Sequence, residues 1–217
     1  YSDFLFDVIK YIMDDKHPNL YFNKDDGLLT TNGKDSPASW MNSIIDGRPV
    51  IPRSGYLVEF NALWYNALKF AEEIAKEKGN IDYSDKLKEN AETACKSFVN
   101  KFMNEAGYLY DYIDGNYKDL NVRPNMIFAV SLPYSPLGKR QKKSVLDFVT
   151  KELLANCGLR TLSPKSDIFR PHYNGSENDK KFAYFNGMAF PWLSGAYIEA
   201  YLNLFQLSGL SLAERIM

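Results

Sequence analysis

The chain has 217 residues, of which 45% are hydrophobic and 24% are charged, an ordinary composition for a soluble globular protein. Its formal net charge of -1 at pH 7 excludes a strongly basic surface of the kind that attracts nucleic acid or an anionic membrane. We therefore expect a neutral or weakly charged partner, and neither nucleic acid nor a membrane.

Metal-site and membrane signals are weak. Cys95 and Cys157 have no metal-ligand spacing and the two histidines, His17 and His172, lie far apart, so we expect no metal site and a reducing, cytoplasmic location. No apolar run approaches the ~20 residues of a membrane span, and the first ten residues lack the order of a signal peptide. Whether a leader peptide has been removed before Tyr1 stays an open question.

The first half of the chain predicts helices separated by a long polar loop. Residues 3–14 repeat apolar positions at helical spacing and predict a first helix. Residues 19–55 are rich in Asn, Asp, Gly, Ser and Pro, and are too long for a simple connector, so they form a candidate functional loop. Residues 56–79 and 83–103 then predict an inner and an outer helix.

The second half of the chain predicts a hairpin followed by further helices. GYLYDYIDGNYKDL at 107–120 alternates in polarity and contains Asp114-Gly115, which predicts a short β-hairpin. A helix is expected at or after Pro124, because proline suits a first helical turn. The remaining expected elements are a helix at about 138–155, an extended piece at GLRTLSP, a polar loop at 164–185 and a helix at 190–207.

This order predicts an all-α fold with paired inner and outer helices, in which the long loops gather at one mouth of an α/α toroid. We expect the helix at 56–79 to be buried on two sides, with a small Ala leaving space between polar groups. Its two stripes are Leu57, Asn61, Trp64 and Leu68 on one side, and Glu59, Ala62 and Asn66 on the other.

Three stretches combine Arg or Asn with aromatic side chains beside or inside apolar helices: 39–68, then 122–129 with 158–164, and 183–197. Amides and guanidinium groups hydrogen-bond hydroxyl pairs, and Tyr and Trp offer flat faces to a ring. This mixture indicates a sugar site. The candidate substrate-binding residues are Trp40, Arg53, Glu59, Asn61, Trp64, Arg123, Asn125, Arg160, Tyr184, Asn186 and Trp192.

Plainer roles compete for several of these residues. Glu59 could favour the macrodipole of its helix by about 0.3–1 kcal/mol, and Trp64 could belong to the core. The three Arg residues could anchor loop carbonyls or carboxylates. Trp40 and Trp192 lie beside loops and are expected to face a ligand.

The motifs WMN…G.PV.PR.G..VE.NALWYNAL, RPN, GLRTLSP and AY..G..FPWL.GAY.EAY resemble, in this order, the amylo-α-1,6-glucosidase domain of glycogen debranching enzymes. The resemblance spans about residues 24–204 and implies an (α/α)6 toroid of the six-hairpin glycosidase type.

The resemblance also implies an activity. The domain removes the α-1,6-linked glucose left on a trimmed branch of an α-glucan by an inverting mechanism. It implies glycogen, limit dextrin or maltooligosaccharides as partners, and no metal or organic cofactor. Inversion uses an acid and a base roughly 6.5 to 9.5 Å apart.

The chain departs from the family pattern at the expected acid. The family has Asp after Trp-Met, whereas this chain has Asn42. An amide cannot deliver a proton, and loss of general-acid help typically costs a factor of roughly 10² to 10⁴ in rate. Asp46 could substitute only if the loop bends differently. In the third stretch Phe185 replaces a His and Phe190 replaces a Trp.

The family's second carboxylate lies in a later glycine-rich motif, which does not occur before Met217. Twelve toroid helices would also need more than about 300 residues. We therefore expect residues 1–217 to form part of such a domain. Three functions stay open: an impaired or incomplete α-1,6-glucosidase, a catalytically silent α-glucan-binding or scaffolding relative, and an α/α adaptor for protein partners.

Overall fold

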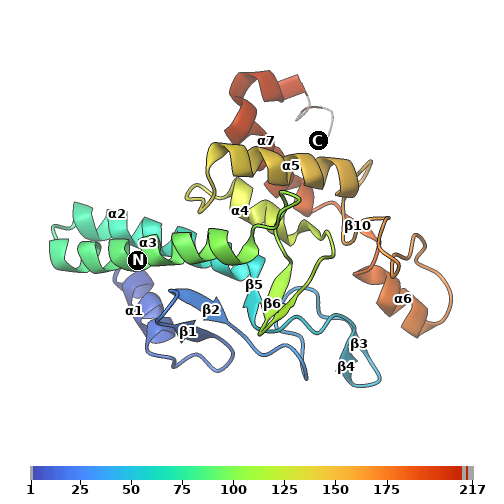
Figure 1. Ribbon diagram of the computed structural model, residues 1–217, viewed down its shortest axis with the longest axis horizontal. Coiled ribbons are helices and arrows are strands. Elements are labelled where there is room, and N and C mark those ends of the chain that lie inside the picture. The colour runs from blue at the N-terminus through green and yellow to red at the C-terminus, as the bar shows by residue number, and fades with distance from the viewer. Residues whose placement is uncertain (1, 212–213, 215–217) are drawn as a thin grey trace.

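The computed structural model describes residues 2–211 and 214, and it consists mainly of helices joined by short antiparallel hairpins (Figure 1). The helices are α1 (Ser2–Met13), α2 (Val58–Glu77), α3 (Ile81–Phe102), α4 (Phe128–Ser131), α5 (Lys139–Leu153), α6 (Glu177–Tyr184) and α7 (Leu193–Phe205), with 3₁₀ turns η1 (Pro124–Ile127) and η2 (Gln206–Gly209).

The strands pair only over short distances and form four small antiparallel sheets in the described part of the chain: β1–β2, β3–β4, β5–β6–β7 and β8–β9–β10. They are β1 (Tyr21–Asn23), β2 (Leu28–Thr30), β3 (Ile44–Ile45), β4 (Arg48–Pro49), β5 (Tyr56–Leu57), β6 (Tyr112–Asp114), β7 (Tyr117–Lys118), β8 (Leu154–Ala155), β9 (Gly158–Arg160) and β10 (Ala189–Phe190).

Helices α2 and α3 form an antiparallel pair along one side of the molecule (Figure 1). The turn between them contains Gly79 in the left-handed region, and the Asn80 side chain caps α3 by accepting a hydrogen bond from the Tyr83 amide at 3.3 Å. Ala71 on α2 and Ala94 on α3 are both fully buried. Their small side chains allow the two helices to approach closely.

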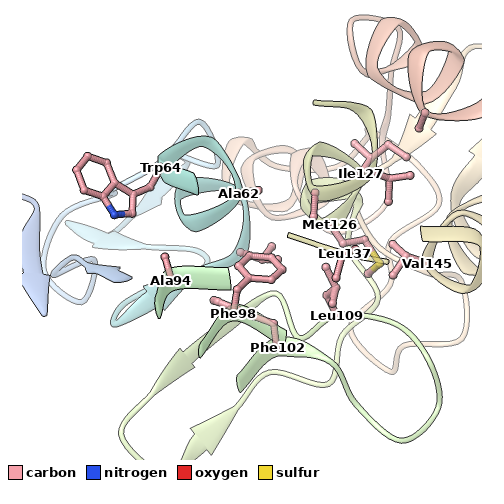
Figure 2. Close-up of a cluster of buried hydrophobic side chains, with 14 of the residues drawn as sticks. Ala62, Trp64, Ala94, Phe98, Phe102, Leu109, Met126, Ile127, Leu137 and Val145 are labelled. Atoms are coloured by element: carbon pink, nitrogen blue, oxygen red, sulfur yellow. The ribbon is translucent and has the colours of Figure 1, made fainter. Parts of the chain in front are cut away.

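The core joins this helix pair to η1, α4 and α5, as Figure 2 shows. Phe98 and Phe102 on α3 lie beside Leu109, and Met126 of η1 and Val145 of α5 complete the contact. Each fully buried large apolar side chain contributes roughly 1.5–3 kcal/mol relative to an exposed one. Burial of these residues therefore fixes η1 relative to α2, which matters for the candidate site.

Strand β5 runs directly into α2 and pairs with β6, so the start of α2 lies against residue Asp111. The Val58 amide donates to the Asp111 carbonyl at 3.1 Å. The β6–β7 hairpin confirms the hairpin expected within 107–120. This pairing brings residues that are more than fifty positions apart into one buried site.

Two long segments expected to be loops contain regular elements. Residues 19–55 include the strands β1 to β4, and residues 164–185 include helix α6. Helix α6 is short and its first five residues are polar, so no apolar repeat revealed it; Ser176 caps it by accepting from the Asp179 amide at 3.2 Å. The helix expected after Pro124 is also short, because Leu132 is extended ahead of Pro133.

Ala62 was expected to leave space between polar groups on α2, and this expectation is wrong. Its side chain is fully buried in the main core. The helices expected at 3–14, 56–79, 83–103, 138–155 and 190–207 are confirmed with small shifts at their ends. The fold is therefore helix-rich with small sheets.

Gly55 provides a test of the β5–β6 contact. Both Gly55 and Gly47 have left-handed backbones, with φ of 77° and 76°, but a Cβ at Gly55 would lie 2.2 Å from the Ile113 carbonyl oxygen, whereas a Cβ at Gly47 would meet nothing within 4 Å. We expect Gly47→Ala to lower the free energy of unfolding by about 1 kcal/mol and Gly55→Ala by at least about 3 kcal/mol. Urea denaturation measures both, and equal losses would contradict the close approach.

Candidate functional site

A buried ion network lies at the start of α2. Arg53, which precedes β5, is 1% exposed, and its partners Glu59 and Asp111 are 3% and 1% exposed. Arg53 Nη2 donates to Glu59 Oε2 at 2.6 Å, its Nη1 donates to Glu59 Oε1, and its Nε donates to Asp111 Oδ2 at 2.6 Å. The Ser39 hydroxyl accepts from Nη1 at 3.0 Å. Two carboxylates therefore hold one guanidinium.

The network keeps Arg53 charged inside the protein. Burial alone would lower the pKa of Arg53, but the Asp111 and Glu59 carboxylates raise it above its usual value. A buried ion pair repays its desolvation only when the geometry is good and the remaining hydrogen bonds are made. Here both edges of the guanidinium are hydrogen-bonded, so the three groups act as one structural unit.

The network continues to Trp40 through Asn125. Asn125 Nδ2 donates to Asp111 Oδ1 at 2.7 Å, and Asn125 Oδ1 accepts from Trp40 Nε1 at 2.8 Å. Asn125 lies in η1 and is fully buried. The Asn125 amide thus hydrogen-bonds Asp111 with its nitrogen and Trp40 with its oxygen. This connects the Trp40 indole to the ion network around Arg53.

Trp40 is the centre of a group of aromatic rings that we call the aromatic wall, made up of Trp40, Tyr184, Phe185, Phe190 and Trp192. The Trp40 ring meets the Trp192 ring edge to face at 5.0 Å, the Phe185 ring at 5.4 Å and the Phe190 ring at 5.7 Å. Tyr184 meets Phe190 at 4.9 Å. Trp192 is 51% exposed and Tyr184 is 40% exposed, so part of the wall is open to solvent.

A second buried arginine, Arg123, fixes the loop that carries part of the wall. Its Nη1 donates to the Phe185 carbonyl at 2.7 Å and to the Thr161 carbonyl at 3.2 Å, and its Nη2 donates to Asn186 Oδ1 at 3.0 Å. Burial lowers the pKa of Arg123, and the neighbouring Asp111 and Asp119 carboxylates oppose that shift. Arg123 therefore connects η1 with the chain that follows α6.

Asn61, Trp64 and Arg160 lie outside the aromatic wall. The Asn61 amide accepts from the Leu29 amide at 2.7 Å and donates to the Leu29 carbonyl at 3.0 Å, and Trp64 Nε1 donates to the Gly27 carbonyl at 3.0 Å. These bonds attach β2 and the turn before it to α2. Arg160 Nη1 donates to the Leu154 carbonyl at 3.2 Å. A substrate role for these three stays a prediction.

Asn42 and Asp46, the two residues considered for the catalytic acid, are both exposed. Asn42 lies in the segment next to the aromatic wall, and Asp46 lies at the tip of a hairpin. Asn42 follows Met41, whose buried side chain packs in a cluster with Phe185. Asp46 forms the β3–β4 turn with Gly47; both have positive φ, as in the tight turns that join short hairpins. The two polar groups are thus separated by strand β3, and the role of each stays a prediction.

Two buried acids of this site, Asp111 and Asp119, were not among the residues predicted from the sequence. Burial and the neighbouring Asp111 carboxylate raise the pKa of Asp119, whose side chain lies 3.9 Å from Arg123 Nε. Asp111 stands in the alternating stretch before β6, at a position where the pattern would place an apolar inward side chain. An acid at an inward position of an alternating stretch indicates a buried carboxylate with a charged partner, and the sequence could have been used to predict one here.

The described residues contain neither a candidate metal-binding cluster nor a candidate membrane-spanning helix. No group of three or more His, Cys, Asp or Glu side chains that could hold a metal ion occurs among residues 2–211 and 214. Within the same residues no helix is both long enough and apolar enough to cross a membrane.

The ion network predicts a large loss of stability on removing one charge. We expect Asp111→Asn to lower the free energy of unfolding by about 3–5 kcal/mol, because it leaves Arg53 partly unpaired and gives Asn125 a donor in place of an acceptor. Asp114→Asn is the matched control, since Asp114 pairs with Lys34 at the surface and should cost less than about 1 kcal/mol. Denaturation followed by tryptophan fluorescence measures both, and similar losses would contradict the network's importance.

The chain is similar to several known proteins. A family model described as amylo-alpha-1,6-glucosidase matches residues 3–215. The glycogen debranching enzyme of Saccharomyces cerevisiae is 24% identical, over 88% of this chain and 15% of the yeast protein, so the chain spans only a small part of that relative. A structure of the neutral trehalase Nth1 from Saccharomyces cerevisiae is also similar, with 15% identity and a TM-score of 0.47. The superposed region makes up 74% of this chain and 40% of the trehalase chain. The match to the family model covers nearly the whole chain, which therefore belongs to the amylo-alpha-1,6-glucosidase family.

Proposed function

We propose that the chain forms part of a domain that binds the α-1,6 branch points of glycogen or a related α-glucan, and that its hydrolysis of the branch glucose is impaired by Asn42. The observation that carries this proposal is the aromatic wall, with Trp192 and Tyr184 exposed next to the segment of Asn42. Family membership supports the same class of substrate.

The aromatic wall suits a carbohydrate ligand. Sugar rings present apolar faces that stack on Trp and Tyr, whose polar tips can hydrogen-bond hydroxyl groups. Buried Asn125 and Arg123 hold the wall from behind through Trp40 and the Phe185 carbonyl. A wall fixed before binding loses little conformational entropy when a ligand arrives, which favours affinity.

The proposed impairment concerns proton transfer. An inverting glycosidase needs an acid that protonates the leaving oxygen and a base that activates water. The Asn42 amide can hydrogen-bond that oxygen but has no proton to give at neutral pH. Glu59 and Asp111 are both held by Arg53, so we assign them structural roles rather than that of the base.

We further propose that residues 1–217 are part of an (α/α)6 toroid and that the protein acts in the cytoplasm. The antiparallel pair α2–α3 and the packing of α4 on α7 support helical layers of this type. Cys95 and Cys157 are free thiols, as is usual in a reducing compartment, and the net charge of -1 gives no attraction to nucleic acid or membranes.

A catalytically silent glucan-binding relative is the second candidate, and Asn42 favours it. Such a protein would keep the wall and lose only the acid. The two candidates predict the same binding and differ in the rate of glucose release. No observation on the described residues favours an adaptor for protein partners over these two candidates.

Asn42→Asp tests the assignment of the acid. We expect the substitution, made in the full natural protein, to raise glucose release from a branched limit dextrin by a factor of roughly 10² to 10⁴. Asn42→Ser is the control, since it changes the same exposed position without supplying a proton donor. Release by the unaltered protein at the rate of the Asp variant would mean that another group donates the proton.

Trp192→Ala tests the aromatic wall. We expect it to weaken maltoheptaose binding about tenfold, which corresponds to about 1.4 kcal/mol, because it removes an exposed stacking surface. Tyr117→Ala is the matched control, because Tyr117 is 54% exposed on β7 and lies outside the wall. Titration calorimetry measures both variants. Equal affinity in all three proteins would contradict the placement of the ligand.

A further inference from the structure

A pocket of about 410 Å³ lies between the β3–β4 hairpin and helix α6, on the side of the molecule where Figure 1 shows these elements together. Its polar lining comes from Arg170, His172, Asn174, Asn178 and Asp179, with Ile45 on the hairpin side. This volume is within the usual range of roughly 300–1,000 Å³ for small-molecule sites. None of its polar residues contributes to the aromatic wall.

The amides of this pocket differ from the buried amides of the chain. Asn61, Asn125 and Asn186 use their side chains in hydrogen bonds within the protein. In the described part of the structure, Asn174 and Asn178 make no side-chain hydrogen bond to another residue, and neither does His172. Each Asn offers one acceptor and two donor hydrogens, so the pocket can serve several hydroxyl groups at once.

The charges of the pocket favour a neutral ligand. Arg170 and Asp179 carry opposite charges, and together they leave no net charge on the lining. Hydrogen bonds from Ser176 lower the pKa of Asp179, so this carboxylate is ionised and accepts hydrogen bonds throughout the neutral range. The Asp179 carboxylate would repel a phosphate, and the Arg170 guanidinium would repel a cation. A polyhydroxyl compound can use both groups.

The walls of the pocket are fixed by backbone contacts. The Arg170 amide donates to the Asn186 carbonyl at 2.7 Å, and Gly187 packs so closely that a Cβ there would lie 2.0 Å from the Arg170 carbonyl oxygen. On the other side of the loop, Gly175 leaves room for Asp179 to cap its own helix. The backbone of the segment that lines the pocket is therefore held in place before a ligand binds.

The same segments also reach the aromatic wall. Helix α6 carries Phe182, which lines the pocket, and ends at Tyr184, which belongs to the wall. In the loop, Tyr173 lies between the pocket residues His172 and Asn174, and its ring is 6.0 Å from the Tyr184 ring. The contact between Tyr173 and Tyr184 therefore connects the aromatic wall with the loop that lines the pocket.

We propose that this pocket binds a second glucose unit of the α-glucan chain, remote from the unit at the wall and held through the amides of Asn174 and Asn178. The inference rests on the proposed function, since it takes the same ligand class. The pocket adds recognition of hydroxyl groups where the wall recognises ring faces.

The two histidines of the chain provide a direct test. His172 lines the pocket, whereas His17 lies near α1, where its Nδ1 accepts from the Asn19 amide at 3.1 Å. On titration with maltoheptaose we expect the ring resonances of His172 to shift in NMR spectra and those of His17 to stay unchanged. Movement of the Trp192 indole resonance without His172 would overturn this inference and leave binding at the wall intact.

The double variant Asn174→Ala/Asn178→Ala provides the affinity test. We expect maltoheptaose binding to weaken at least about fivefold, since several hydrogen bonds to hydroxyl groups are lost. Asn116→Ala, at the exposed β6–β7 turn, is the matched control. Unchanged affinity in the double variant would overturn the pocket, whereas no binding by the unaltered protein would overturn the proposed function as well.

Discussion

The structure depends on the burial of one positive charge. Arg53 precedes β5, and its guanidinium stays inside the protein because Glu59 on α2 and Asp111, just before β6, both accept hydrogen bonds from it. This requirement fixes the β5–β6 pairing, the start of α2 and, through Asn125, the position of η1. The arrangement of the hairpins thus depends on this electrostatic constraint together with the apolar packing of η1 in the core.

Two kinds of polar side chain can be distinguished by what they contact. Arg53, Arg123 and Asn125 were expected to meet a sugar, and all three are at most 2% exposed and bonded to other parts of the chain. His172, Asn174 and Asn178, which line the pocket beside α6, are exposed instead. The buried polar groups therefore hold the aromatic rings in place, and the exposed polar groups are the ones that a ligand could reach.

Sequence patterns predicted the long helices because apolar residues recur on their buried faces, as Leu87, Ala91 and Phe98 do on α3. Helix α6 escaped prediction because Ala183 alone among its eight residues is buried, so the helix shows no apolar repeat. The site was predicted in its residue types but not in its contacts. No local pattern could show that Asp111, fifty-eight positions away, is the partner of Arg53.

The exposure of Asn42 has a consequence for the structural cost of substitutions at this position. Its side chain makes no hydrogen bond to another described residue, so a substitution there leaves the Arg53 network and the core intact. Mutational drift at this position is therefore nearly free of folding penalties. If position 42 holds the acid, as proposed, an exchange between Asp and Asn there changes proton donation and leaves the buried framework of the fold as it is.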